Sequence, residues 1–266
     1  MPPVVLCQGL VGSLFDYASD GLNLVPGLRG GRVRYWHGID DALRAAGYPV
    51  LAPRVHPTGG VAARARQLKA AVLRWRRELR RDDGTTPKLV FAAHSMGGLD
   101  VRHLVSRLGL AEETAAVLTV STPHRGSAFA DYTMRYVQRR VGIFGLLTKL
   151  GLDVASSRDL TMRAAQRFND ETPDAPGVTY CSVTAGVPPR EMSPVLRASG
   201  RLIASAQGEN DGLVAASSSE WGRVVGRWQS DHFQQINKGF PVAQRWVLTG
   251  QQWVSAVDAT RRAAGL

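Results

Sequence analysis

Apolar and polar positions along the chain follow two alternating patterns. Short runs of apolar residues predict buried strands, and longer segments with an apolar residue every three or four positions predict amphipathic helices. The predicted strands are residues 3–8, 48–53, 88–94, 114–121, 178–185 and 202–206. The predicted helices are residues 35–46, 61–81, 96–108, 129–150, 157–169 and 241–264. Strands that alternate with helices indicate βαβ units, so we expect an α/β fold with a mostly parallel central sheet flanked by helices.

Residues 128–172 interrupt this alternation, because two predicted helices follow each other there with no strand between them. The first of the two mixes apolar with basic residues. We interpret 128–172 as a helical lid-like insertion within a single domain that spans residues 1–266. The alternative, that this helical pair merely packs on the sheet, stays open. Residues 14–34 are rich in glycine and predict an irregular surface loop.

The junction between the strand at 88–94 and the next helix has the sequence Ala93-His-Ser-Met-Gly-Gly98. A serine with small residues two positions to either side, placed between a strand and a helix, is typical of a nucleophile elbow. In such an elbow a sharp turn lifts the serine hydroxyl clear of the sheet, and glycines let the turn tighten. Ser95 is therefore the candidate nucleophile, and the alternative is an ordinary strand–turn–helix junction.

A serine nucleophile needs a base that takes its proton and an acid that orients the base. In a hydrolase of this architecture the two follow the serine in the order acid, then histidine. Of the six histidines, His232 has the expected late position; the others are His37, His56, His94, His103 and His124. Asp211, in a tight turn before His232, is the candidate acid, and Glu209 and Asp231 are the alternatives.

The negative charge of the tetrahedral intermediate needs two preorganised donors. The first is the backbone N–H of the residue that follows the nucleophile, which is Met96. The second should come from the loop after an early strand, and Leu10 follows the strand predicted at 3–8. Backbone donors leave no side-chain signature, so both assignments come from position alone.

The net charge of +11 raises the question of nucleic-acid binding. The basic residues are mostly arginines spread over helix faces, with no aromatic-interleaved basic groove, so we expect no nucleic-acid partner. On the helix predicted at 61–81 they form a face that we expect to be solvated, made of Arg64, Lys69, Arg74, Arg76, Arg77 and Arg80. Transient attraction to anionic lipid surfaces would be a secondary consequence of this charge.

Several other kinds of segment and site are not indicated by the sequence. No apolar run approaches the roughly 18 to 20 residues that a membrane span needs. Cys7 and Cys181 both lie in apolar strand-like runs, so we expect two buried thiols rather than a disulfide. No CxxC or HExxH spacing indicates a metal, and serine catalysis needs no cofactor, so none is expected.

Four blocks of sequence together carry a resemblance. They are residues 35–39, 93–98, 121–131, and 210–214 with 231–232 beyond it. The third block contains Thr122-Pro-His-Arg-Gly-Ser127 and is the most specific, because no general argument about hydrolases predicts it. On these blocks the chain resembles the bacterial triacylglycerol lipases of the Pseudomonas and Burkholderia type, in the α/β-hydrolase superfamily.

The resemblance implies an α/β-hydrolase fold with a helical lid after residue 131. It implies Ser95 as nucleophile, Asp211 as acid and His232 as base, with the two oxyanion donors named above. It also implies that the substrate is a carboxylic ester with medium or long acyl chains.

The chain departs from the family pattern at several positions. Gln8 replaces the histidine that usually precedes the oxyanion loop, and Ala93 replaces a glycine. The family's structural calcium uses two positions that hold Gln234 and Lys238 here, so we expect no calcium site, with the Lys238 ammonium in its place. The disulfide partner near the acid is also missing. With no leader pattern after Met1, these departures predict a cytoplasmic protein if Met1 is the true start.

We therefore predict a serine hydrolase, a lipase or carboxylesterase, that works through an acyl-enzyme on Ser95. An acyltransferase or thioesterase on the same triad is an alternative, because one acyl-enzyme can serve different acyl acceptors. A catalytically silent hydrolase-fold protein that binds lipid is a further alternative. The complete set of Ser95, Asp211 and His232 argues against that silent protein.

Overall fold

The computed structural model describes residues 1–10, 34–56, 59–139, 154–238 and 243–266. At the centre of this part of the chain is a parallel sheet with the strand order β2-β1-β3-β4-β5-β6. The strands are β1 Val4–Cys7, β2 Val50–Leu51, β3 Leu89–His94, β4 Thr114–Val120, β5 Thr179–Ala185 and β6 Arg223–Trp228. The inner strands are buried almost throughout, and the edge strand β6 is largely exposed.

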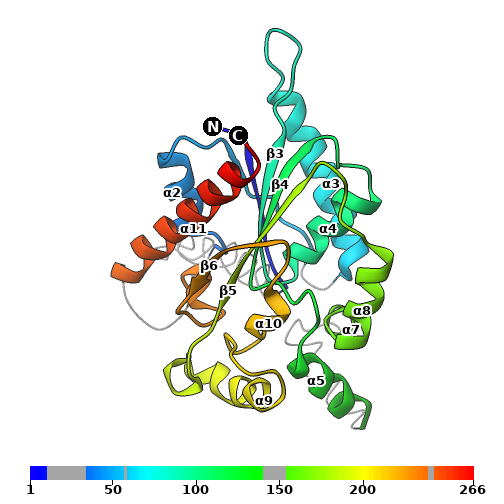
Figure 1. Ribbon diagram of the computed structural model, residues 1–266, viewed down its shortest axis with the longest axis vertical. Coiled ribbons are helices and arrows are strands. Elements are labelled where there is room, and N and C mark those ends of the chain that lie inside the picture. The colour runs from blue at the N-terminus through cyan, green and yellow to red at the C-terminus, as the bar shows by residue number, and fades with distance from the viewer. Residues whose placement is uncertain (11–33, 57–58, 140–153, 239–242) are drawn as a thin grey trace, which may run out of the picture.

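Helices cover both faces of the sheet (Figure 1). The helices are α2 Ile39–Ala45, α3 Val61–Glu78, α4 Gly97–Arg107, α5 Ala128–Arg139, α7 Val154–Asp159, α8 Met162–Glu171, α9 Arg197–Gln207, α10 Ala216–Ser219 and α11 Ala243–Ala263. Because successive side chains of a strand point to opposite faces, Val4 and Leu6 of β1 pack with α2 and α11, whereas Val5 and Cys7 pack with α3 and α4. Two apolar cores result, one on each side of the sheet.

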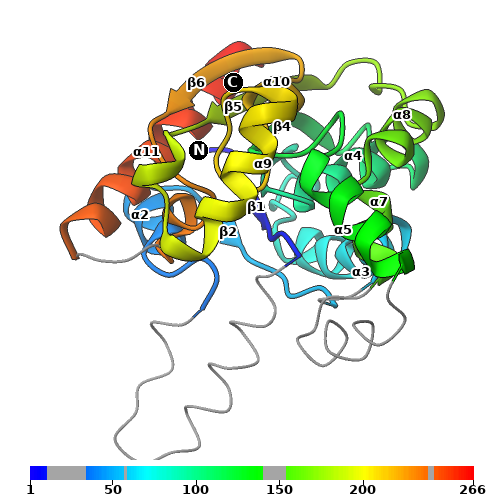
Figure 2. The same cartoon turned by 90° about the horizontal axis from the view of Figure 1, so that it is seen from below.

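A second group of helices lies beyond the carboxyl ends of the strands, at the bottom of Figure 1. Seen from below in Figure 2, α5 and α9 lie side by side there. Three short 3₁₀ turns complete the described elements, at η2 Pro189–Glu191, η3 Pro194–Leu196 and η4 Gln234–Ile236. Ligand sites of open α/β sheets form at this carboxyl end, so this group of helices can shape one.

Five of the predicted strands are confirmed as β1 to β5, but the strand predicted at 202–206 is wrong. That run lies inside α9, where the buried positions are Ser199, Gly200 and Ile203. These positions are three or four residues apart, which is helical spacing, and a short apolar run alone cannot separate strand from helix. The sixth strand is β6, whose exposed positions hide it from a search for buried runs.

The predicted helices are confirmed with shifted ends. The helix predicted at 35–46 begins at Ile39, after a turn, and the helix predicted at 157–169 divides into α7 and α8. The division falls at Thr161, whose side chain caps α8 by accepting a hydrogen bond from the N–H of Ala164 at 3.3 Å. Most of the loop predicted at 14–34, the later part of the helix predicted at 129–150 and the start of the last helix lie outside the described residues.

Both cysteines are buried and neither is in a disulfide, as predicted. Within the described ranges, no helix combines the length and the hydrophobicity that crossing a membrane would require.

Candidate active site

Ser95 occupies a sharp turn between β3 and α4. Its φ of 56° lies in the left-handed region, which is strained for a residue other than glycine. The turn is held on both sides, since Ser95 N donates to the carbonyl of Val120 at 2.9 Å and Thr122 Oγ1 donates to the Ser95 carbonyl at 2.7 Å. A Cβ at Gly97 would collide with the backbone of Cys7. This is the geometry of a nucleophile elbow, as the sequence predicts.

His232 and Asp211 are in direct contact. The distance from His232 Nδ1 to Asp211 Oδ2 is 2.7 Å, and both side chains are buried. The other oxygen, Asp211 Oδ1, accepts hydrogen bonds from the N–H groups of Leu213 at 3.0 Å and Val214 at 2.8 Å. These bonds orient the carboxylate toward the imidazole.

The two alternative acids lie elsewhere. The Asp231 carboxylate accepts hydrogen bonds from the N–H and hydroxyl of Ser193, both at 2.7 Å, and from the N–H groups of Phe233 and Gln234. Glu209 is exposed. Of the three candidate acids, Asp211 is the one that the structure places against His232.

Electrostatics keep Asp211 ionised. Burial acts to raise the pKa of Asp211, but the neighbouring His232 and the hydrogen bonds to His232, Leu213 and Val214 outweigh it and lower the pKa below its usual value. An ionised carboxylate at this position can stabilise a positively charged imidazole.

The loop that carries Leu10 lies directly against the nucleophile. A Cβ at Gly9 would be 2.7 Å from Ser95 Cβ and 3.1 Å from Ser95 Oγ, so only glycine permits this approach. Leu10 lines the same cavity as Ser95, and Met96 stands at the N-terminus of α4 with its side chain buried. The structure thus places both predicted oxyanion donors next to the elbow.

Arg64 supports this loop, and the expectation that it lies on a solvated helix face is wrong. Its side chain is completely buried; Nη2 donates to the Gln8 carbonyl at 2.6 Å and Nε donates to Asp100 Oδ2 at 2.8 Å. Burial raises the pKa of Asp100 to about 6, although the Arg64 guanidinium acts in the opposite direction. A signal for this role exists in the sequence, since Arg64 falls between Val61 and Leu68 on the apolar stripe of α3.

The motif at 122–127 connects several parts of the site. Ser127 Oγ donates to the carbonyl of Leu213 at 2.7 Å, next to the acid, and Arg125 Nη1 donates to the Ser217 carbonyl. Asn169 of α8 donates to the carbonyl of His124 at 2.8 Å. Together with the bond from Thr122 to the elbow, these contacts tie the nucleophile, the acid loop and α8 to one segment.

One cavity of about 360 Å³ contains the candidate residues. Ser95, His232 and Leu10 lie on its wall, and the rest of the lining is mainly apolar. The apolar lining includes Pro123, Phe129, Ala130, Met134, Leu160, Val195, Leu196, Leu213, Val214, Phe233 and Ile236. Such a lining suits a long apolar group held beside the nucleophile.

The positions that hold calcium in the lipases resembled above do not fit that ion here. Lys238 Nζ donates to the Arg34 carbonyl at 2.7 Å, and the Gln234 side chain accepts from the Asp231 N–H at 3.0 Å. Calcium prefers several carboxylate and carbonyl oxygens, whereas Lys238 supplies an ammonium and the Gln234 side-chain oxygen already accepts a hydrogen bond. Among the described residues, no group of three or more His, Cys, Asp or Glu side chains is arranged to hold a metal.

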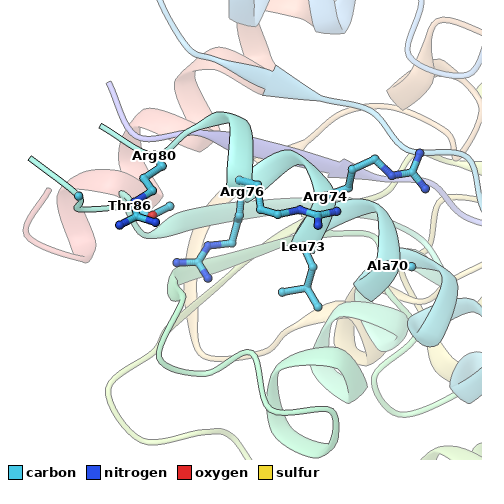
Figure 3. A pocket seen from close by; sticks show the side chains of 8 residues that line it. Ala70, Leu73, Arg74, Arg76, Arg80 and Thr86 are labelled. Carbon is cyan, nitrogen blue, oxygen red and sulfur yellow. The ribbon is translucent and has the colours of Figure 1, made fainter. Parts of the chain in front are cut away.

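A second hollow, of about 650 Å³, lies on the surface of α3 and the loop that follows it (Figure 3). Its lining includes Arg74, Arg76 and Arg77 of α3, Arg80 just after that helix, and Gly84 and Thr86 of the following loop. That loop precedes the start of β3, whereas Ser95 follows the end of β3. The arginine-lined hollow therefore takes no part in the candidate chemistry.

Comparison with known proteins identifies triacylglycerol lipases among the relatives of this chain. No family model matches the chain. It is 30% identical to triacylglycerol lipase 2 of Saccharomyces cerevisiae, over 77% of this chain and 63% of the yeast protein. It is 25% identical to a triacylglycerol lipase of Burkholderia plantarii, over 89% of this chain and 79% of that protein. The chain thus spans less than two thirds of the yeast relative and most of the bacterial one.

Solved structures resemble this one over nearly its whole length. A metagenomic carboxyl esterase matches with a TM-score of 0.71 at 22% identity, covering 99% of this chain and 75% of the esterase. The lipase of Staphylococcus hyicus matches with a TM-score of 0.69 at 16% identity, covering 99% of this chain and 96% of the lipase. At these identities the match concerns the fold, and it confirms the predicted α/β-hydrolase fold.

Proposed function

We infer that this chain is an α/β hydrolase of the triacylglycerol lipase kind and that it hydrolyses carboxylic esters, with Ser95 as its nucleophile. The observation that carries the proposal is the meeting of three features in one apolar cavity. A strained turn presents Ser95, the buried pair of His232 and Asp211 lies beside the same cavity, and the oxyanion loop touches the serine. The names of its relatives agree with this chemistry.

In the first half-reaction, His232 takes the proton of Ser95 Oγ as that oxygen attacks the carbonyl carbon of the ester. The carbonyl π electrons move to its oxygen, and the N–H groups of Leu10 and Met96 hold the resulting oxyanion. When the carbonyl re-forms, the bond to the alcohol oxygen breaks, and His232 delivers its proton to the departing alcohol. An acyl-enzyme on Ser95 remains.

In the second half-reaction, His232 takes a proton from water as the water oxygen attacks the acyl carbon. The bond to Ser95 Oγ breaks, the serine recovers its proton from His232, and the carboxylic acid leaves. Asp211 accepts the hydrogen bond from His232 Nδ1 throughout, which keeps Nε2 available as the proton acceptor. Because this chain's own groups serve every step, we propose that no cofactor takes part.

We propose medium or long acyl chains as the substrate's apolar part. The apolar lining of the cavity supports this, and one wall comes from the 128–172 segment through Phe129, Met134 and Leu160. Tyr132 and Tyr136 of α5 stack on each other and are exposed. We propose that this segment acts as a lid, with these two rings facing the lipid substrate.

A series of p-nitrophenyl esters from acetate to palmitate tests the proposal, with Ser95→Ala as the matched variant. We expect turnover that is highest on a medium or long chain and disappears in Ser95→Ala, while the melting temperature stays close to that of the unmodified protein. Turnover on acetate and butyrate alone would contradict the proposed acyl preference. Absence of turnover on every ester would favour a silent lipid-binding protein.

A further inference from the structure

A continuous row of buried hydrogen bonds runs behind the active site. The N–H of Gly9 donates to Tyr35 Oη at 3.0 Å, and Tyr35 Oη lies 2.5 Å from His94 Nδ1. His94 Nε2 lies 2.8 Å from Gln235 Oε1, and Gln235 Nε2 lies 3.0 Å from Asp211 Oδ2. The row begins beside the oxyanion loop and ends on the candidate acid.

Chemistry fixes the direction of each bond in this row. Ionised Asp211 can only accept, so Gln235 Nε2 donates to it and Gln235 Oε1 faces His94 as an acceptor. His94 Nε2 must then carry the proton, which leaves Nδ1 of a neutral ring to accept from the Tyr35 hydroxyl. Burial, followed by the nearby His232, lowers the pKa of His94 well below its usual value, so the neutral ring is the stable form.

The side chains of this row have very little exposure to solvent. Tyr35, His94 and Gln235 are each at most 2% exposed, and Asp211 is fully buried. In such surroundings hydrogen bonds are strong and a missing partner is costly. Both nitrogens of His94 are occupied in this row, which also explains why the histidine next to Ser95 is not its base.

The two ends of the row are the two parts of the site that must be aligned with Ser95. Gly9 precedes the donor Leu10 and lies so near Ser95 that a Cβ at Gly9 would be 2.7 Å from Ser95 Cβ. Asp211 Oδ2, which receives Gln235, is the same oxygen that receives His232 Nδ1. A shift of either end would move an oxyanion donor or the base relative to the nucleophile.

We propose that Tyr35, His94 and Gln235 are positioning residues that couple the oxyanion loop to Asp211 and set both in register with Ser95. The proposal rests on the proposed function, since the row matters only if these groups catalyse. It assigns a role in ester hydrolysis to three residues that do not take part in proton transfer to the substrate. Gln235 does not line the cavity, so its effect cannot come from a lost contact with the ester.

Two variants break the row at separate bonds with little change in shape. Tyr35→Phe removes the hydroxyl. Gln235→Met removes the amide oxygen and the amide NH₂ and keeps a side chain of similar length. Tyr48→Phe is the matched control, because Tyr48 is equally buried and donates to Asp258, but it does not line the cavity. Melting temperatures, kcat and KM are measured for each, with kcat expressed per active site titrated by a phosphonate.

We expect Tyr35→Phe and Gln235→Met each to lower kcat about tenfold with little change in KM, and Tyr48→Phe to leave both unchanged. The double variant distinguishes coupling from two separate losses. If the row acts as one unit, the double variant loses about as much as the more damaged single variant, rather than the product of about a hundredfold. We expect every variant that lowers kcat to unfold as cooperatively as Tyr48→Phe does.

Unchanged kcat in both single variants would overturn the proposal, and so would a double variant whose loss is the product of the single losses. If Tyr35→Phe does not fold, His94→Asn replaces it in the same cycle, because it keeps an acceptor for Tyr35 but removes the donor to Gln235. Failure of the proposed function is seen separately, as absence of turnover in the unmodified protein.

Discussion

Replacing Asp211 by asparagine should lower kcat about 10⁴-fold, because it reverses the tautomer of His232. Asp211 Oδ1 accepts two backbone N–H groups, from Leu213 and Val214, so the asparagine carbonyl oxygen will take that position. The NH₂ group then faces His232 and Gln235, in place of the oxygen that accepts from both.

The consequence for the base follows from its hydrogen-bonding groups. An NH₂ group cannot accept the proton on His232 Nδ1, so the neutral ring is favoured with its proton on Nε2. Nε2 then cannot take the proton of Ser95. Rotating the asparagine amide by half a turn would restore an oxygen acceptor for His232. Its NH₂ group would then face the N–H donors of Leu213 and Val214. A loss of about 10⁴ in kcat corresponds to about 5 kcal/mol in activation free energy.

The assay is the initial rate of p-nitrophenyl octanoate hydrolysis per titrated active site, with Glu209→Gln as the matched control. Glu209 is exposed and two residues away, so its variant should keep the rate of the unmodified protein. A rate for Asp211→Asn within about tenfold of the unmodified protein would refute the tautomer argument. A large loss in Glu209→Gln alone would move the acid to that residue.

Two further predictions concern stability. Arg64→Met should lower both kcat and the free energy of unfolding, the latter by about 3–5 kcal/mol, because it leaves buried Asp100 without its partner. Urea unfolding checks it, and Arg77→Met on the exposed side of α3 should cost less than about 0.5 kcal/mol. The second prediction concerns Asp211, whose pKa is lower in the folded state than its usual value of 3.8. Its ionised carboxylate should therefore stabilise the fold at pH values above 3.8, and this contribution should be lost as the pH falls through the folded pKa. The difference in free energy of unfolding between the unmodified protein and Asp211→Asn should therefore shrink as the pH drops below about 4; a constant difference would contradict the linkage.

The sequence predicts the local parts of this site well. The elbow depends on residues that are neighbours in the chain, so its pattern is visible around Ser95 without any tertiary information. Asp211 and His232 could be chosen because this architecture fixes the order of acid and base along the chain. The sequence alone leaves Glu209 and Asp231 as alternative acids, whereas the structure places Asp211 against His232.

The remaining features depend on contacts between distant segments. The contacts of Arg64 depend on the packing of α3 against α4 and on the loop after β1, and a basic residue among other arginines gives no sign of a partner such as Asp100. Tyr35, His94 and Gln235 come from three separate parts of the chain and meet only in the folded protein. The apolar stripe of α3 indicates that Arg64 is buried, but no local pattern shows its partner Asp100 or the contacts among Tyr35, His94 and Gln235.

The error at 202–206 has a different cause. That run is short, and its apolar and polar residues do not alternate clearly, so a strand and a helix fit it equally well. In the structure, α9 buries Ile203 on one side and leaves much of the remainder exposed. The edge strand β6 has the complementary property: most of its side chains are at least partly exposed to solvent, so it lacks the buried apolar run that predicts a strand.

The central claim is that Ser95 attacks the ester and carries the acyl group. Its most direct test is to treat the protein with a serine-directed phosphonate, measure the intact mass and map the modified peptide. The remaining esterase rate is measured on the same samples, and Ser95→Ala is treated in parallel as the control. We expect one adduct, located on Ser95, formed in step with the loss of turnover and absent from Ser95→Ala. An adduct on another serine, or turnover that survives complete modification of Ser95, would contradict the claim.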